Sequence, residues 1–77
     1  MTARAVYRVL VSSGGSAPAF LASRDRLDHV EVVNIASGEV ELLWDLPARE
    51  ARRLAYRLRE DLDVLEAEEF VEAWRRA

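Results

Sequence analysis

Two apolar stripes that one straight helix cannot bury together place the strongest constraint on how this chain folds. The first stripe has the i, i+3, i+4, i+7 spacing of an amphipathic helix and consists of Ala51, Leu54, Ala55, Leu58, Leu62 and Leu65. The second stripe, made by Ala67, Phe70, Val71 and Trp74, projects onto nearly the opposite side of the same helical wheel. A bend or a second helix is therefore required near Asp63, which has the spacing of a capping box with Glu66.

A proline indicates where the first of these helices starts. Pro47 follows Asp45 and Leu46, and proline is favoured in a first helical turn because its missing N–H would have no partner there. Glu50 adds negative charge where the helix dipole stabilises it. The pattern predicts a helix from Pro47 through the leucine stripe.

Three segments before Pro47 have the composition of β-strands. Ala5 to Ser12 alternates and is rich in valine, while His29 to Ala36 and Glu39 to Leu46 flank Ser37-Gly38. The last two segments predict a hairpin with a two-residue loop.

That hairpin would bury one particular face of the sheet. A two-residue loop pairs Ile35 with Val40, Val33 with Leu42 and Glu31 with Trp44. We therefore expect the long helix to cover the face made by Val33, Ile35, Val40 and Leu42. The opposite face, with Val30, Val32 and Leu43 among polar residues, is expected to be partly wet.

The segment between the first two strands predicts a crossover. Ser12-Ser13-Gly14-Gly15-Ser16 reads as a loop, and Ala17 to Leu27 lacks β-branched residues, which favours a helix over a short strand around Phe20. Such a connection lets the first two strands run parallel. The prediction is one α/β (α+β) domain over residues 1–77, with order βαββα(α) and a three-stranded mixed sheet covered by helices.

Composition limits the chemistry available to the chain. It has no cysteine, a single histidine and 11 basic residues, all of them arginine, which excludes disulfides, thiolate metal sites and lysine Schiff bases. No apolar stretch reaches membrane-spanning length, and Arg8 interrupts any signal-peptide core. We expect a cytoplasmic protein from a GC-rich genome or a thermophile, without metal, cofactor or membrane partner.

The small size of the chain favours association with other chains. A chain of this length buries only about 60% of its unfolded surface, and no disulfide stabilises the resulting core. We therefore expect a homo-oligomer, or a complex with another protein.

The serine-glycine loop is one candidate binding site. If it joins a strand to a helix N-terminus, the backbone amides of Gly14, Gly15 and Ser16 could hold an anion such as phosphate. The chain lacks a Gly-x-Gly-x-x-Gly motif and a phosphate-binding lysine, so a plain connector is the stronger interpretation.

The charges of the helical region are separated into two blocks. Five arginines and one glutamate between Arg49 and Arg59 give +4, and seven acids between Glu60 and Glu72 give -7. These blocks favour docking of unlike surfaces, with Arg53 and Arg57 as candidate interface residues. Nucleic-acid binding is the less favoured alternative, because the net charge is -3 and Arg57–Asp61 and Arg59–Asp63 have the spacing of local ion pairs.

Two further features have a structural and a functional interpretation. His29 could join Ser12 or Ser13 and Asp25 or Asp28 in a catalytic triad, but an ordinary strand-end histidine is favoured. Phe70, Val71 and Trp74 belong either to the core, which is favoured, or to an interface.

The sequence therefore predicts a noncatalytic interaction or regulatory module that self-associates. An anion-binding or enzymatic domain built on the Ser12–Ser16 loop is the first alternative, and a nucleic-acid binder through residues 49–59 is the second.

Overall fold

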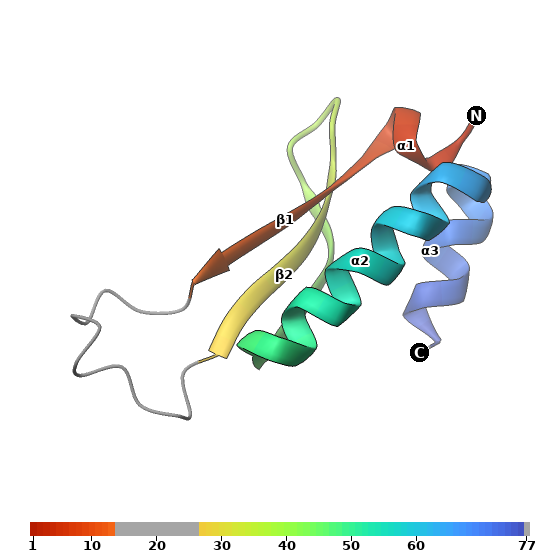
Figure 1. Cartoon of the computed structure of the whole chain (residues 1–77). Helices are drawn as coiled ribbons and strands as arrows, with labels where there is room; N and C mark the ends of the chain where they lie inside the picture. The colour runs from red at the N-terminus through yellow and green to blue at the C-terminus, as the bar shows by residue number, and fades with distance from the viewer. Residues whose placement is uncertain (14–26, 77) are drawn as a thin grey trace, which may run out of the picture.

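Three antiparallel strands form one sheet, and a long helix lies along one of its sides (Figure 1). The computed structural model describes residues 1–13 and 27–76. In chain order its elements are α1 (Ala3–Val6), β1 (Tyr7–Ser13), β2 (Leu27–Asn34), β3 (Val40–Pro47), α2 (Ala48–Val64) and α3 (Ala67–Arg75). The predicted small α+β domain with a three-stranded sheet is confirmed.

The predicted mixed sheet with parallel first strands is wrong. β1 pairs antiparallel with β2, with Tyr7 opposite Asn34 and Ser13 opposite Asp28. The chain leaves β1 and enters β2 at the same end of the sheet, so no crossover is needed; the length of the connection permits a crossover but does not require one. The predicted helix 17–27 and the alternative strand around Phe20 lie outside the described residues, except for Leu27, which begins β2.

The first strand also begins later than predicted, because Ala5 and Val6 belong to the short helix α1. Ala3 is fully buried, and its N–H donates to the carbonyl of Leu65 at 2.9 Å. The N–H of Ala67 in turn donates to the carbonyl of Met1 at 2.9 Å. These long-range bonds hold the start of the chain against the connection between α2 and α3, a contact that no local sequence pattern signals.

The hairpin loop contains the five residues 35–39, not the predicted Ser37-Gly38 pair. The Asn34 N–H donates to the carbonyl of Glu39, and the Gly38 N–H donates to the carbonyl of Asn34, both at 2.8 Å. The Asn34 side chain accepts the N–H groups of Ala36 and Ser37 at 2.9 and 3.1 Å, which stabilises a wider turn. Gly38 closes this turn with a φ of 76°, a conformation that glycine adopts without a steric penalty.

A bulge in β3, beside the wider loop, changes which residues of β2 are buried. Val33 pairs with Val40, the register then shifts, and Val32 pairs with Leu42, which leaves Glu41 as the extra residue of a bulge. Because a one-residue shift turns a strand over, Val30 and Val32 are fully buried while Ile35 and Val40 are exposed. The expectation that α2 covers Val33, Ile35 and Val40 is wrong, and only Leu42 of that set packs against the core.

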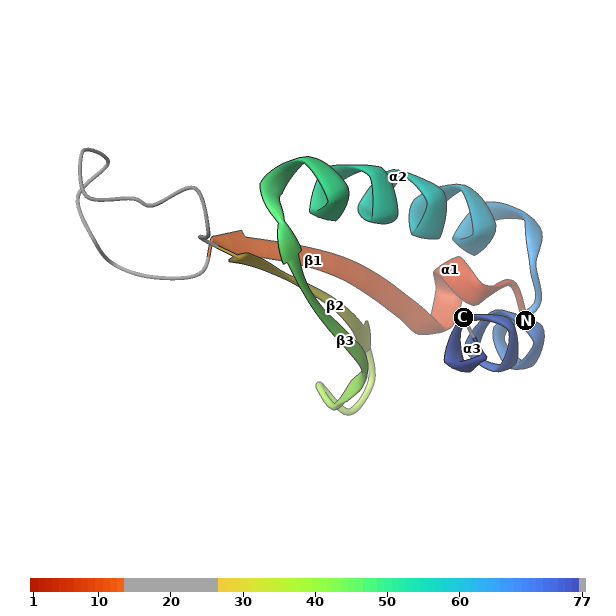
Figure 2. The same ribbon diagram turned by 90° about the horizontal axis from the view of Figure 1, so that it is seen from below.

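The leucine stripe of α2 behaves as predicted and covers the other face of the sheet (Figure 2). Its buried members are Ala51, Ala55, Leu58 and Leu62, with Leu54 and Leu65 partly buried. On the sheet side the core contains Val9, Val30 and Val32. Pro47 ends β3 and occupies the N-cap position of α2, close to where the sequence places the start of this helix.

The predicted break between two helices is confirmed, but its predicted capping box is not formed. α2 ends at Val64 and α3 begins at Ala67, with Glu66 as the cap residue and no side-chain hydrogen bond at the cap. The Glu66 carboxylate instead pairs with the Met1 amino group at 2.7 Å, and Asp63 pairs with Arg4 at 3.6 Å. Both acidic side chains therefore contact the start of the chain.

The second apolar stripe also lies in the core. Phe70 stacks on Tyr7 with ring centroids 6.0 Å apart, and Trp74 meets Trp44 edge to face at 6.1 Å. Tyr7 and Trp44 are in register with the buried side of the sheet, so α3 packs against the same side as α2. Among the residues that the structure describes, no helix is long and apolar enough to span a membrane.

We expect Leu58→Ala to test this core. Leu58 is fully buried, and the substitution should lower the free energy of unfolding by about 2–5 kcal/mol because it removes buried apolar atoms and leaves a cavity. The matched control is Val64→Ala, in the same helix but exposed, which should change the free energy by less than about 0.5 kcal/mol. Urea denaturation of both variants measures this; equal losses would contradict the packing of α2.

Candidate interaction surface

In the described part of the chain, α2 covers one side of the sheet and no helix covers the opposite side (Figure 2). Successive side chains of a strand point to opposite faces, and Val9, Val30 and Val32 point toward α2. Their neighbours therefore point away from α2. We call this surface the open face; its strand residues are Arg8, Leu10, Ser12, Leu27, His29, Glu31, Val33, Val40, Leu43 and Asp45. We include Ile35, the residue after β2, because it lines one depression together with Arg8, Leu10 and Val33.

Large apolar side chains are only half buried on the open face. Their exposed fractions are 56% for Leu43, 50% for Val40, 49% for Ile35, 45% for Leu10 and 41% for Leu27. Leu10 and Leu43 flank Glu31 in one row across the strands, and Val33 and Val40 are neighbours in the next row. Single exposed apolar residues are common, but contiguous ones mark interaction surfaces.

A small depression lies at the hairpin end of the open face. Its volume is about 140 Å³, and it is lined by Arg8, Leu10, Val33, Asn34, Ile35 and Gly38. The lining is mainly aliphatic, with the Arg8 side chain on one side. Such a depression suits one apolar side chain from another molecule.

The charged groups of the open face include one pair that is already satisfied. Nδ1 of His29 is hydrogen-bonded to Oδ1 of Asp45, the residue directly opposite it on β3. Arg8 and Glu31, by contrast, take part in no ion pair within residues 1–13 and 27–76. One cation and one anion of this face are thus available to a partner.

The described residues do not assemble the catalytic triad with Asp28 that was considered from the sequence, and the alternative acid, Asp25, lies outside them. His29 lies directly opposite Ser12 on β1 but is bonded to Asp45, whereas Asp28 is buried on the other face of the sheet. Within the described part of the chain, no hydrogen bond joins Ser12 to His29, although a catalytic serine–histidine pair requires one. His29 and Asp45 form a cross-strand pair at the sheet surface.

The serine-glycine loop is the second site proposed from the sequence. Gly14, Gly15 and Ser16 all lie outside the described residues. The structure therefore leaves the anion-binding hypothesis as a prediction.

The arginine helix presents its charged side away from the sheet, but one of its candidate residues is held in an intrachain contact. The guanidinium of Arg57 lies 5.6 Å from the centre of a Trp74 ring, and the Trp74 Nε1–H donates to Asp61 at 3.0 Å. The described residues contain neither predicted ion pair, because Asp61 bonds to Trp74 and Asp63 pairs with Arg4. Arg53 is exposed, on the side of the molecule opposite the open face.

The three apolar interface candidates of α3 are covered within the chain itself. Phe70 is fully buried, and Val71 and Trp74 are nearly so. The core role that the sequence favours for them accounts for their burial.

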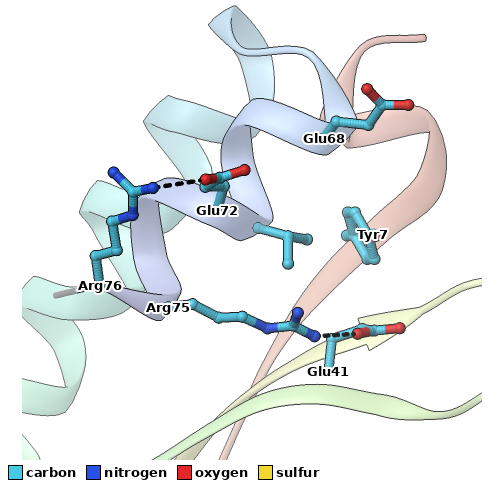
Figure 3. A pocket seen from close by; sticks show the side chains of 7 residues that line it. Tyr7, Glu41, Glu68, Glu72, Arg75 and Arg76 are labelled. Atoms are coloured by element: carbon cyan, nitrogen blue, oxygen red, sulfur yellow. Dashed lines mark hydrogen bonds and ion pairs between the residues drawn. The ribbon is translucent and has the colours of Figure 1, made fainter.

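A larger pocket lies between α3 and the sheet (Figure 3). It has a volume of about 550 Å³ and is lined by Tyr7, Glu41, Glu68, Val71, Glu72, Arg75 and Arg76. Arg75 donates to Glu41 at 3.2 Å and Arg76 donates to Glu72 at 2.8 Å (Figure 3). Both cations of the pocket are already paired with carboxylates, so an anionic ligand would have to displace an internal partner.

Sequence reasoning missed the open face because it gave β2 the wrong register. One signal was available: Asn34, the only asparagine of the chain, precedes Ile35 and begins the turn through its side-chain oxygen. Asparagine often starts turns in this way, which would have favoured a longer loop. The described residues contain no group of three or more potential metal ligands.

Comparisons with known proteins do not add a functional assignment. No protein-family model matches the chain, and searches of curated proteins and of solved structures give no match either.

Substitutions on opposite faces of the sheet should have unequal effects on stability. Leu43→Thr changes a half-exposed residue of the open face and should alter the free energy of unfolding of a dilute sample by less than about 0.5 kcal/mol. Val32→Thr places a hydroxyl in the core under α2 and should cost roughly 1–3 kcal/mol. Chemical denaturation at low protein concentration measures both values; a larger loss for Leu43→Thr would contradict the assignment of the faces.

The acid-base behaviour of Tyr56 tests the outer side of α2. A hydrogen bond to the Glu60 carboxylate and the charge of that group raise the pKa of Tyr56 above its usual value of 10.0. Since the folded-state pKa is raised, the stabilising contribution is present below pH 10 and disappears as the pH rises through the folded value. We expect Glu60→Gln to lower the pKa of Tyr56 in an NMR titration, whereas Glu69→Gln, in α3, should leave it unchanged. A Tyr56 pKa that Glu60→Gln does not lower would contradict this hydrogen bond.

Proposed function

We propose that the chain is a small noncatalytic interaction module that self-associates through the open face of its sheet. The observation that supports this proposal is the contiguous set of half-exposed apolar side chains on a sheet face that no described helix covers. The occupant that we propose for this face is a second copy of the same chain.

The pattern of side chains differs from that of a sheet face adapted to water. An antiparallel sheet with one solvated face normally alternates apolar residues inside with polar residues outside. Leu10, Val33, Val40 and Leu43 depart from this alternation, because they are the outward residues of their strands. Packing a second sheet on this face would remove their apolar surface from water, at about 25 cal/mol per Å² buried.

The size and the charges of the face favour a second copy as the partner. The two-layer core of a chain of 77 residues is small, and dimerisation adds a third and a fourth layer. The open face has both a free cation, Arg8, and a free anion, Glu31, within the described part of the chain. A surface with both signs can face its own copy without net repulsion, and two-fold dimers are the most common assemblies.

Sedimentation equilibrium of the wild type and of Leu10→Ser/Leu43→Ser tests this function. We expect the wild type to form dimers at protein concentrations of about 10 µM to 1 mM, since the face is at the small end of stable interfaces. The double variant should stay monomeric while its circular dichroism spectrum remains that of the folded protein.

The matched control is Val64→Ser, which changes an exposed apolar residue at the end of α2 and should dimerise like the wild type. A wild type that is monomeric at about 1 mM, far above the dissociation constants expected for a specific interface, would overturn the proposed function.

A further inference from the structure

Resting on the proposed self-association, we infer a specific arrangement of the dimer: a two-fold pair of sheets in which Arg8 of each copy forms an ion pair with Glu31 of the partner subunit. In the same arrangement, Leu43 of each copy enters the depression lined by Arg8, Val33 and Ile35 of the other. The inference comes from the positions of these side chains on the open face.

Four neighbouring residues of β1 and β2 form a square with alternating character. Arg8 is directly opposite Val33, and Leu10 is directly opposite Glu31. One diagonal of the square therefore joins the two charges, and the other joins the two apolar residues. This pattern is complementary to its own copy when a two-fold axis in the plane of the interface relates the two sheets.

A two-fold axis between two stacked sheets lies in the plane of the interface, so each residue faces the mirror position across the axis. The vector from Glu31 to Arg8 crosses one strand spacing, about 4.8 Å, and two residues along the strand, about 6.6 Å. An axis that bisects this vector at right angles brings Arg8 over Glu31 of the partner subunit and the reverse. It also passes near Leu10 and Val33, which then meet their own copies.

The same operation fixes the angle between the sheets. Because the charged diagonal is inclined to the strands, the strands of the two copies cross at roughly 70°, close to the orthogonal class of sheet packing. With the same strand spacing and rise per residue, the two-fold axis brings Leu43 of one copy to a point between Arg8, Val33 and Ile35 of the other copy. These three residues line the depression of about 140 Å³, so the operation derived from the charges also brings an exposed leucine to it.

The ion pairs would select this arrangement over other ways of stacking two apolar faces. Arg8 and Glu31 have no ion-pair partner within the described residues, so a dimer gives them one without breaking an internal bond. An arginine–carboxylate pair forms directional, bidentate hydrogen bonds. Charge pairs at an interface set register and partner choice more than total affinity.

Charge reversal tests this pairing on the full chain. Arg8→Glu places two pairs of glutamates in contact, and Glu31→Arg places two pairs of arginines in contact, so each single variant should dimerise at least tenfold more weakly than the wild type. An equimolar mixture of the two variants should form heterodimers with an affinity near that of the wild-type dimer, since both pairs are attractive again. The double variant Arg8→Glu/Glu31→Arg should recover homodimers for the same reason.

The control is Arg53→Glu, which reverses an exposed arginine of α2 on the far side of the molecule and should leave dimerisation unchanged. Circular dichroism establishes that each variant is folded. A dimeric wild type with no heterodimer in the mixture and no recovery in the double variant would overturn the Arg8–Glu31 pairing while leaving self-association standing. A monomeric wild type would overturn both.

Discussion

The packing of one long helix against one face of a three-stranded sheet determines the rest of this structure. α2 offers a single apolar stripe, and Val9, Val30 and Val32 are the strand residues that it covers. The described residues include no second long helix for the other side, since α3 contacts Tyr7 and Trp44 on the same side as α2. Over residues 1–13 and 27–76 the fold is therefore a two-layer structure, and no described helix covers its second sheet face.

The position of α3 depends on long-range contacts with the start of the chain. The N–H of Ala3 donates to the carbonyl of Leu65, and the N–H of Ala67 donates to the carbonyl of Met1. The first residues of the chain therefore hold the α2–α3 connection in place, and no side-chain cap does so. This allows Phe70 and Trp74 to complete the core. The stripe that could have formed an interface is therefore buried in the core, and the described residues keep a contiguous set of half-exposed apolar side chains on the open face.

The sequence predicted those parts of the fold that have a local periodicity. The leucine stripe, the start of α2 near Pro47 and the break before Ala67 follow from helical spacing. The register of the hairpin depends instead on a side-chain turn at Asn34, a positive φ at Gly38 and a bulge at Glu41. The one-residue bulge reverses the face of β2 relative to β3, and without the bulge the sequence pattern assigned Val33 and Ile35 to the core. The antiparallel pairing of β1 with β2 could not be predicted from the sequence either, because a long connection is compatible with parallel and with antiparallel strands.

The same limits explain what could be predicted of the candidate site. The expectation of self-association came from the chain length and the lack of a disulfide, and neither of these depends on the register of the strands. Locating the proposed interaction surface required knowledge of which side chains point outward. The sequence analysis therefore did not select Arg8, Leu10, Glu31 and Leu43, and considered Phe70 and Trp74 instead. Contacts between different elements also took the place of the predicted pairs within one helix: Asp61 of α2 accepts from Trp74 of α3, and Asp63 pairs with Arg4 of α1.

The central claim is that the open face is where two copies of the chain meet. It is tested most directly by isotope-filtered NMR on a dimer of one labelled and one unlabelled copy, which detects methyl contacts between the copies alone. The account predicts contacts from Leu43 of one copy to Val33 and Ile35 of the other, and none that involve Val30, Val32 or Leu58. Contacts confined to the outer side of α2, or to α3, would contradict it.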